Sequence, residues 1–340
     1  TDEHGRVLRD NVWGTQAEAA ARRDFTINAL YYDPVADIVL DYHDGVRDLK
    51  ARTLRMIGDP TTRFREDPVR MLRVARFVAK LGFKIDPATR KPIAELAPLV
   101  RNVPSARLFD EMLKLLTSGH AMACLQELRR EGLHHGMLPM LDVILEQPDG
   151  KSFVSLALER TDERVRAERT ISPGFLFATL LWQPVAVRWR EGVARGAPAI
   201  PALADAIDSV LDEQGNRLAI TRRFLADMRE IWMMQPRFER RTGRSPWGLV
   251  EHLRFRAGYD FLLLRCQSGE LPEEIGRWWT DFQGADNEQR EALIAAAQTS
   301  RSAGGPGSGT GARKRRRRSG RKRSESAGEG RDLSDPGQAA

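Results

Sequence analysis

A short stretch near the N-terminus combines side chains that suit a triphosphate and a metal ion. Arg22 and Arg23 carry guanidinium groups, whose forked N–H donors match phosphate oxygens. Asp24 adds a carboxylate, a hard oxygen ligand for Mg²⁺. Asn28 follows four residues later, so it shares a face with Asp24 if the segment is helical. A solvated helical face that only keeps the protein soluble has the same composition, and both interpretations stay open.

A second cluster places one acidic and three basic side chains at intervals of three residues. They are Asp67, Arg70, Arg73 and Arg76. On a helix they form a drifting stripe beside an apolar face. Asp67 and Arg70 together offer an acceptor and a donor to a base edge, and the other arginines suit phosphates. A ladder of i,i+3 salt bridges, worth roughly a few tenths of a kcal/mol per pair, explains the spacing equally well.

The elements that must position these clusters are short at first and helical afterwards. Thr15 and Glu18 form a capping-box pattern for a helix start, and strand-like segments follow at 30–32, 38–42 and 53–57. The segment 41–49, DYHDGVRDL, predicts a turn and the start of a helix. From residue 66 the pattern is helical, with amphipathic stretches near 152–168, 172–194, 201–213, 222–235, 246–267 and 270–283. Six tryptophans in this part are expected in the core: Trp182, Trp189, Trp232, Trp247, Trp278 and Trp279.

Composition excludes several classes of protein. The chain of 340 residues has 54 basic and 47 acidic side chains. Its two cysteines, Cys124 and Cys266, cannot form a disulfide framework or a cysteine zinc site, and they indicate a reducing compartment. No apolar run approaches the roughly 18 residues of a membrane span, and no signal peptide opens the sequence. We predict a cytoplasmic protein without membrane contact.

The positive charge is concentrated at the C-terminal end. Residues 301–340 hold 11 basic and 4 acidic side chains, so the preceding 300 residues are formally neutral. Almost no large apolar side chain occurs there, and we predict a disordered tail. Phosphate contacts would let it bind RNA without reading sequence. A solubility tail or an arm for an acidic protein partner stays open. The basic cluster comprises Arg313, Lys314, Arg315, Arg316, Arg317, Arg318, Arg321, Lys322 and Arg323.

Three motifs taken in order resemble a known superfamily. RRDFTINAL (22–30), the D-x-x-G-x-x-D-L pattern within 41–49, and REDPVRMLRVARFVAKLGF (65–83) resemble the class II poly(A) polymerases and CCA-adding tRNA nucleotidyltransferases of bacteria. The stretches 174–182 and 236–265, together with 216–224 and the Arg-rich end, resemble the poly(A) polymerases more closely. The resemblance covers about residues 1–283.

The resemblance implies a mostly α fold in four parts. Residues 1–60 would be the C-terminal part of an α/β nucleotidyltransferase palm, 61–145 a helical neck that binds nucleotide and RNA, 146–300 a helical RNA-binding body, and 301–340 the basic tail. The Gly-Ser or Gly-Gly turn and the Asp-x-Asp pair of the family have no match here. We therefore expect a chain that begins after that region and is inactive by itself.

The resemblance also implies a reaction. An RNA 3′-hydroxyl would attack the α-phosphate of ATP, with two Mg²⁺ ions clamping the attacking and leaving oxygens. Asp24 would be the third acidic residue of that site, catalytic and metal-binding, whereas Arg23 and Asn28 would contact phosphate and ribose. Partners would be RNA 3′ ends, ATP and RNA-decay proteins, and the protein would be a monomer.

By the same resemblance, Asp67 and Arg70 would face the base, and Arg73 and Arg76 would contact phosphates or form the wall. Two other functions stay open. A CCA-adding enzyme would incorporate CTP, and a non-catalytic helical RNA-binding adaptor would explain the missing Asp-x-Asp.

Overall fold

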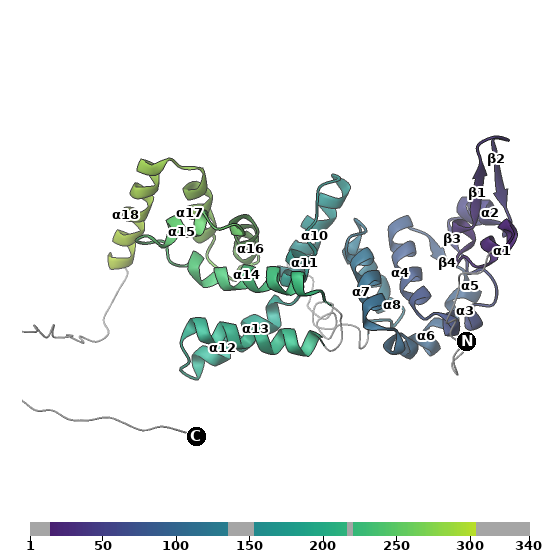
Figure 1. Ribbon diagram of the computed structural model, residues 1–340, viewed down its shortest axis with the longest axis horizontal. Coiled ribbons are helices and arrows are strands. Elements are labelled where there is room, and N and C mark those ends of the chain that lie inside the picture. Colours follow the sequence, from purple (N-terminus) through teal and green to yellow (C-terminus); the bar gives the residue numbers. More distant parts are fainter. Residues whose placement is uncertain (1–13, 135–152, 216–219, 304–340) are drawn as a thin grey trace, which may run out of the picture. The chain divides into compact units, whose positions relative to one another are not determined.

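The computed structural model describes residues 14–134, 153–215 and 220–303 (Figure 1). Within these ranges the chain is mostly helical, with two sheets of two strands each, which confirms the expected fold class. The chain divides into two compact units, Thr1–Thr299 and Ser300–Ala340. The basic cluster of residues 313–323 lies outside the described residues.

The first part of the chain is a small α/β region. Its elements are α1 (Gln16–Ala21), η1 (Thr26–Asn28), β1 (Leu30–Asp33), β2 (Ile38–Asp41) and α2 (Gly45–Lys50). The capping box of Thr15 and Glu18 forms as predicted. β1 and β2 make an antiparallel hairpin in which Leu30 lies opposite Asp41.

The turn after β2 forms where the sequence predicts it. The Asp41 carboxylate accepts hydrogen bonds from the backbone N–H groups of His43, Gly45 and Val46, and α2 begins directly after it. A side-chain carbon at position 45 would lie 2.3 Å from the carbonyl oxygen of Thr26, so only glycine fits. The close approach packs α2 against η1.

A parallel strand pair and two helices follow. β3 (Thr53–Leu54) pairs with β4 (Lys84–Ile85), and α3 (Pro60–Glu66) precedes α4 (Val69–Leu81). Helix therefore starts six residues earlier than predicted, and it is interrupted at Asp67. Asp67 is extended, with φ −149° and ψ 94°, because the ring of the following proline disfavours the α conformation. Gly82 ends α4 with φ 65°, a left-handed conformation that glycine adopts without strain.

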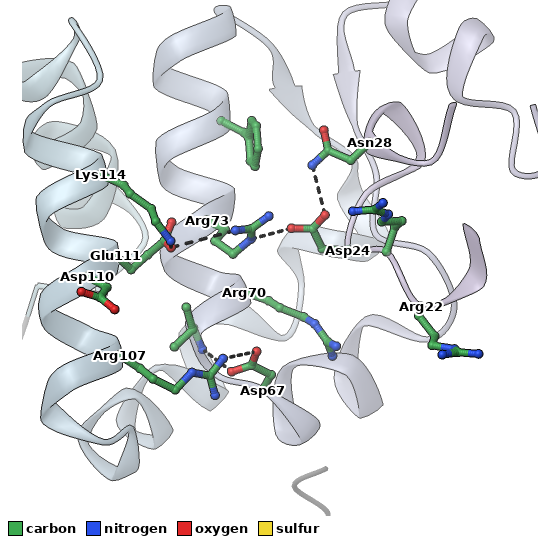
Figure 2. A pocket seen from close by; sticks show the side chains of 13 residues that line it. Arg22, Asp24, Asn28, Asp67, Arg70, Arg73, Arg107, Asp110, Glu111 and Lys114 are labelled. Carbon is green, nitrogen blue, oxygen red and sulfur yellow. Dashed lines mark hydrogen bonds and ion pairs between the residues drawn. The ribbon is translucent and has the colours of Figure 1, made fainter. Parts of the chain in front are cut away.

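Short helices and two longer ones complete the region before residue 135. They are α5 (Pro87–Arg90), α6 (Ile93–Leu96), η2 (Ala97–Asn102), α7 (Ser105–Leu116) and α8 (Ala121–Arg130). α4 packs against both α7 and α8 through buried side chains that include Leu72, Met112 and Leu125. This packing fixes α7 beside α4, as Figure 2 shows.

The remaining described residues are helical. The elements are α10 (Phe153–Arg166), α11 (Pro173–Leu180), α12 (Trp182–Ala194), α13 (Ala199–Gly215), α14 (Arg222–Phe238), α15 (Ser245–Val250), α16 (Phe255–Gln267), α17 (Glu273–Gly284) and α18 (Asn287–Ala303). The predicted stretches 172–194 and 246–267 each contain two helices. α18 was not predicted, because its sequence is rich in alanine and has few large apolar residues. No described helix is long and apolar enough to cross a lipid bilayer.

The tryptophans confirm the predicted core. Trp182, Trp232, Trp278 and Trp279 are buried, and Trp189 and Trp247 pack at the edges of the two main apolar clusters.

Candidate active site

Asp24 lies on a segment that the rest of the α/β region holds in place. Phe25 forms an antiparallel bridge with Met56, and the N–H of Ile57 donates to the carbonyl oxygen of Asp24 at 2.9 Å. α1 ends before this segment, so the helix assumed for Asp24 and Asn28 is not formed. A 3₁₀ turn, η1, brings Asn28 back to Asp24 instead.

Asp24 is 8% exposed, and its carboxylate accepts three hydrogen bonds. Arg73 Nε donates to one oxygen at 2.6 Å and Asn28 Nδ2 donates to the other at 3.0 Å (Figure 2). The backbone N–H of Phe25 donates to the same oxygen as Asn28, also at 3.0 Å. Burial raises the pKa of Asp24. The charge of Arg73 and these hydrogen bonds lower the pKa by more than burial raises it, so the net shift is downward. Asp24 is therefore ionised at neutral pH.

Glu111 of α7 organises the neighbouring arginines. This carboxylate is buried and accepts from Arg76 Nε at 2.8 Å. Arg73 Nη1 lies 3.9 Å and Lys114 Nζ 3.5 Å from its other oxygen. Arg73 thus lies between two carboxylates, Asp24 and Glu111 (Figure 2).

Asp67 lies in the extended link between α3 and α4. Its carboxylate accepts from Arg107 Nη2 of α7 at 2.8 Å. Arg70 donates to Glu66 Oε2 at 3.0 Å rather than to Asp67. The four residues spaced by three, Asp67, Arg70, Arg73 and Arg76, each pair with a side chain outside their own set, so the salt-bridge ladder considered from the sequence is wrong.

These side chains line one pocket with a volume of about 630 Å³. Six of the seven predicted site residues line it, and the seventh, Arg76, contacts the lining residues Glu111 and Phe77. The lining carries six cationic and four acidic side chains, so it suits a polyanion. The full lining is Arg22, Arg23, Asp24, Asn28, Asp67, Val69, Arg70, Arg73, Phe77, Arg107, Asp110, Glu111 and Lys114.

The wall contributed by α7 was not predicted from the sequence. Arg107, Asp110, Glu111 and Lys114 fall on one helical face at spacings of three and four residues. The charged face opposite Leu108, Met112 and Leu115 was the available signal. Such a face is typical of solvent exposure, and it does not reveal that α4 packs beside it.

The described residues do not complete a metal site. No group of three or more His, Cys, Asp or Glu side chains that could hold a metal ion occurs in that part of the chain. Asp24 can offer oxygen ligands, but Arg73 and Asn28 occupy them.

Comparison with solved structures identifies the class of fold. The structure of a tRNA-processing enzyme with CTP aligns with a TM-score of 0.53 at 19% identity, covering 84% of this chain and 75% of that one. An apo form of a tRNA-processing enzyme aligns with a TM-score of 0.51 at 20% identity, covering 83% and 76%. The chain has the nucleotidyltransferase fold.

Sequence comparison identifies the family within this class. Three family models match: the poly A polymerase head domain at residues 3–55, the probable RNA and SrmB-binding site of polymerase A at 82–145, and the polymerase A arginine-rich C-terminus at 195–323. Together they match well over half of the chain. The chain belongs to the bacterial poly(A) polymerase family, as its motifs predicted.

The similarity to individual proteins agrees with this family membership. Poly(A) polymerase I of Haemophilus influenzae is 44% identical over 302 residues, covering 86% of this chain and 66% of that protein. Poly(A) polymerase I of Salmonella typhi is 40% identical over 299 residues, covering 86% and 64%. A CCA-adding enzyme of Bacillus licheniformis is 40% identical over 125 residues, which is 37% of this chain and 31% of that enzyme. The chain thus spans slightly less than two thirds of the length of the poly(A) polymerases it matches.

Proposed function

We propose that the protein transfers adenylate from ATP to RNA 3′ ends. The observation that carries this proposal is the pocket itself, which joins Arg23, Asp24 and Asn28 to the arginines of α4. Membership of the poly(A) polymerase family supports it. The CCA-adding relative matches little more than a third of the chain, so we place CTP addition second.

Different pocket residues contact the phosphates, the ribose and the base of the nucleotide. Arg23 and Arg73 bind phosphate oxygens through charge-assisted hydrogen bonds, and Asn28 contacts the ribose. Asp67 and Arg70 face the base. Arg76 binds no nucleotide directly and supports the wall through Glu111.

Asp24 is the catalytic carboxylate in this proposal and supplies oxygen ligands to Mg²⁺. A bound Mg²⁺ would supply Lewis-acid chemistry, polarising a phosphate and lowering the pKa of an attacking hydroxyl. Arg73 now occupies one oxygen of Asp24, and it would retain Glu111, 3.9 Å away, as a carboxylate partner if Asp24 bound an ion.

RNA binding is proposed for the basic tail as well. Arg313, Lys314, Arg315, Arg316, Arg317, Arg318, Arg321, Lys322 and Arg323 would contact phosphates without sequence preference. The family model of an arginine-rich C-terminus covers these residues and supports the proposal.

The test is nucleotide addition by the full-length protein to a short RNA. With Mg²⁺ present, we expect long tails from ATP and little incorporation from CTP. Addition of two cytidylates and one adenylate, followed by arrest, would identify a CCA-adding enzyme. RNA binding without any transfer would leave the adaptor function. The 340-residue chain alone should bind RNA and add no nucleotide, because its sequence contains no Asp-x-Asp pair.

A further inference from the structure

An arginine outside the pocket holds the backbone that precedes Asp24. Nη2 of Arg63, on α3, donates to the carbonyl oxygen of Arg22 at 3.0 Å and to that of Arg23 at 2.8 Å. Two successive carbonyls are thus bound by one guanidinium nitrogen. This contact joins residues about 40 positions apart in the chain and fixes the peptide that leads into Asp24.

The same guanidinium is tied to the base-facing side of the pocket. Arg63 Nη1 donates to Glu66 Oε2 at 2.9 Å, and Arg70 Nη1 donates to the same oxygen at 3.0 Å. Arg70 Nη1 also donates to the carbonyl oxygen of Arg63 at 2.8 Å. Arg63, Glu66 and Arg70 therefore form a closed set of contacts, which we call the clasp.

The clasp is sheltered but lies beside the pocket. The side chains of Arg63 and Arg70 are 15% and 13% exposed, so water screens their contacts weakly. Neither Arg63 nor Glu66 lines the pocket, whereas both segments that the clasp connects do. A group in this position acts on a ligand through the residues it holds.

We infer that Arg63 is a positioning residue that sets the distance between the phosphate-binding segment at residues 22–24 and the base-facing pair Asp67 and Arg70. The inference rests on the proposed function, because it assigns the two segments to opposite ends of one nucleotide. A shift of about 1 Å in a positioning group costs up to about 100-fold in rate, so a loosened clasp should affect ATP use far more than RNA binding.

The experiment compares three variants of the full-length protein. Arg63→Met removes the donors, Arg63→Lys keeps a charge without the fork, and Arg65→Met is the matched control, an exposed arginine two residues along α3. We expect Arg63→Met to lower kcat/KM for ATP by about 10- to 100-fold, with KM for RNA within about twofold of the parent. Arg63→Lys should recover part of the loss, because an ammonium can reach one carbonyl but cannot also span to Glu66. Arg65→Met should match the parent.

The inference would be overturned if Arg63→Met has a lower Tm than the parent but the same kcat/KM for ATP as the control Arg65→Met. Arg63 would then be a stabilising residue only. If Arg63→Met does not fold, Arg63→Lys replaces it as the test. A kcat/KM for ATP in Arg63→Lys equal to that of the parent would also overturn the inference.

A parent protein that adds no nucleotide would contradict the proposed function instead. Hydrogen exchange then tests the clasp alone. Arg63→Met should speed the exchange of the amides of residues 23–25 and Arg65→Met should not. Equal exchange in the two variants would overturn the inference.

Discussion

The pocket region and the helical body differ in what they bury. Between residues 14 and 134, the structure buries the carboxylates of Asp24, Asp48 and Glu111, and each is held by at least one arginine. Between residues 153 and 299, charged side chains such as Asp227 and Arg265 are buried as well, but the largest buried side chains are aromatic, such as Trp232 and Trp279. Buried ion pairs contribute little net stability because desolvation opposes their attraction, whereas buried rings contribute much. We therefore expect substitutions of the buried carboxylates around the pocket to act mainly on function, and substitutions of the buried rings of the body to act mainly on stability.

The aromatic packing of the body is dense. Trp279 lies with its ring centroid 5.0 Å from those of Phe238 and Trp278, and its Nε1 donates to the carbonyl oxygen of Phe238 at 2.8 Å. Trp278 stacks on Phe282 at 4.8 Å. The rings thus bury their apolar area while the indole N–H groups remain hydrogen-bonded.

The largest expected effect is on the pocket side. In the full-length protein, Asp24→Ala should lower kcat by about 1,000-fold or more while leaving RNA affinity nearly unchanged, because a catalytic carboxylate acts mainly in the transition state. Single-turnover adenylation and an RNA-binding titration measure the two quantities. A kcat close to that of the parent would make Asp24 a structural partner of Arg73 only. It would also contradict the expectation that the buried carboxylates of the pocket region serve catalysis.

The matching change in the body should act on stability. Trp279→Ala leaves a large cavity and should lower the free energy of unfolding by about 3–5 kcal/mol, measured by urea denaturation. Trp247, at the edge of the same cluster, is the control, and Trp247→Ala should cost clearly less. Equal losses from the two substitutions would show that the aromatic cluster does not carry the stability of the body.

A smaller effect, on nucleotide selectivity, is expected from replacing Arg70 by lysine, which keeps the positive charge but not the planar guanidinium. Arg70→Lys retains a cation beside Glu66 but loses the planar fork, so discrimination between ATP and CTP should fall by about 1–3 kcal/mol, by analogy with base-edge recognition. The ratio of kcat/KM for the two nucleotides measures it, with Arg65→Lys as the control. Unchanged selectivity with a lower Tm would limit Arg70 to its role in the clasp.

The pKa of Asp24 predicts a modest dependence of stability on pH. Its folded-state pKa lies below the ordinary value, so the ionised group stabilises the fold above that value, and the contribution is lost as pH falls through the lowered pKa. The difference in unfolding free energy between the parent and Asp24→Asn should therefore narrow between about pH 5 and pH 3. A difference that grows on acidification would contradict the assigned shift.

The smallest effect on chemistry is expected from the tail. Removal of residues 304–340 leaves α18 intact and should flatten the slope of log K against log salt by roughly 0.7 per lost phosphate contact. The rate at saturating RNA should not change. Replacement of the nine basic side chains of residues 313–323 by glutamine should act in the same way. An unchanged slope would assign the tail to solubility or to a protein partner.

Sequence patterns predicted which residues meet but not how they pair. The clusters at residues 22–28 and 67–73 converge on one pocket, as their motifs implied. Their actual partners lie far along the chain: Arg73 pairs with Asp24 across 49 residues, and Asp67 with Arg107 across 40. Helical periodicity reports only neighbours within a turn or two, so these long-range pairs and the charged wall of α7 were not predictable from it.

The ion pairs of the pocket also have a consequence for residence time. Arg73 is already bound by Asp24, Arg70 by Glu66, and Arg107 by Asp67. In the proposed reaction, an incoming triphosphate would have to displace the protein's own carboxylates from these arginines, and the carboxylates would bind the arginines again as pyrophosphate leaves. Each exchange lowers the net affinity for phosphate groups while retaining their recognition. Rapid release between successive additions is the kinetic property that the proposed addition of many adenylates to one RNA end would require.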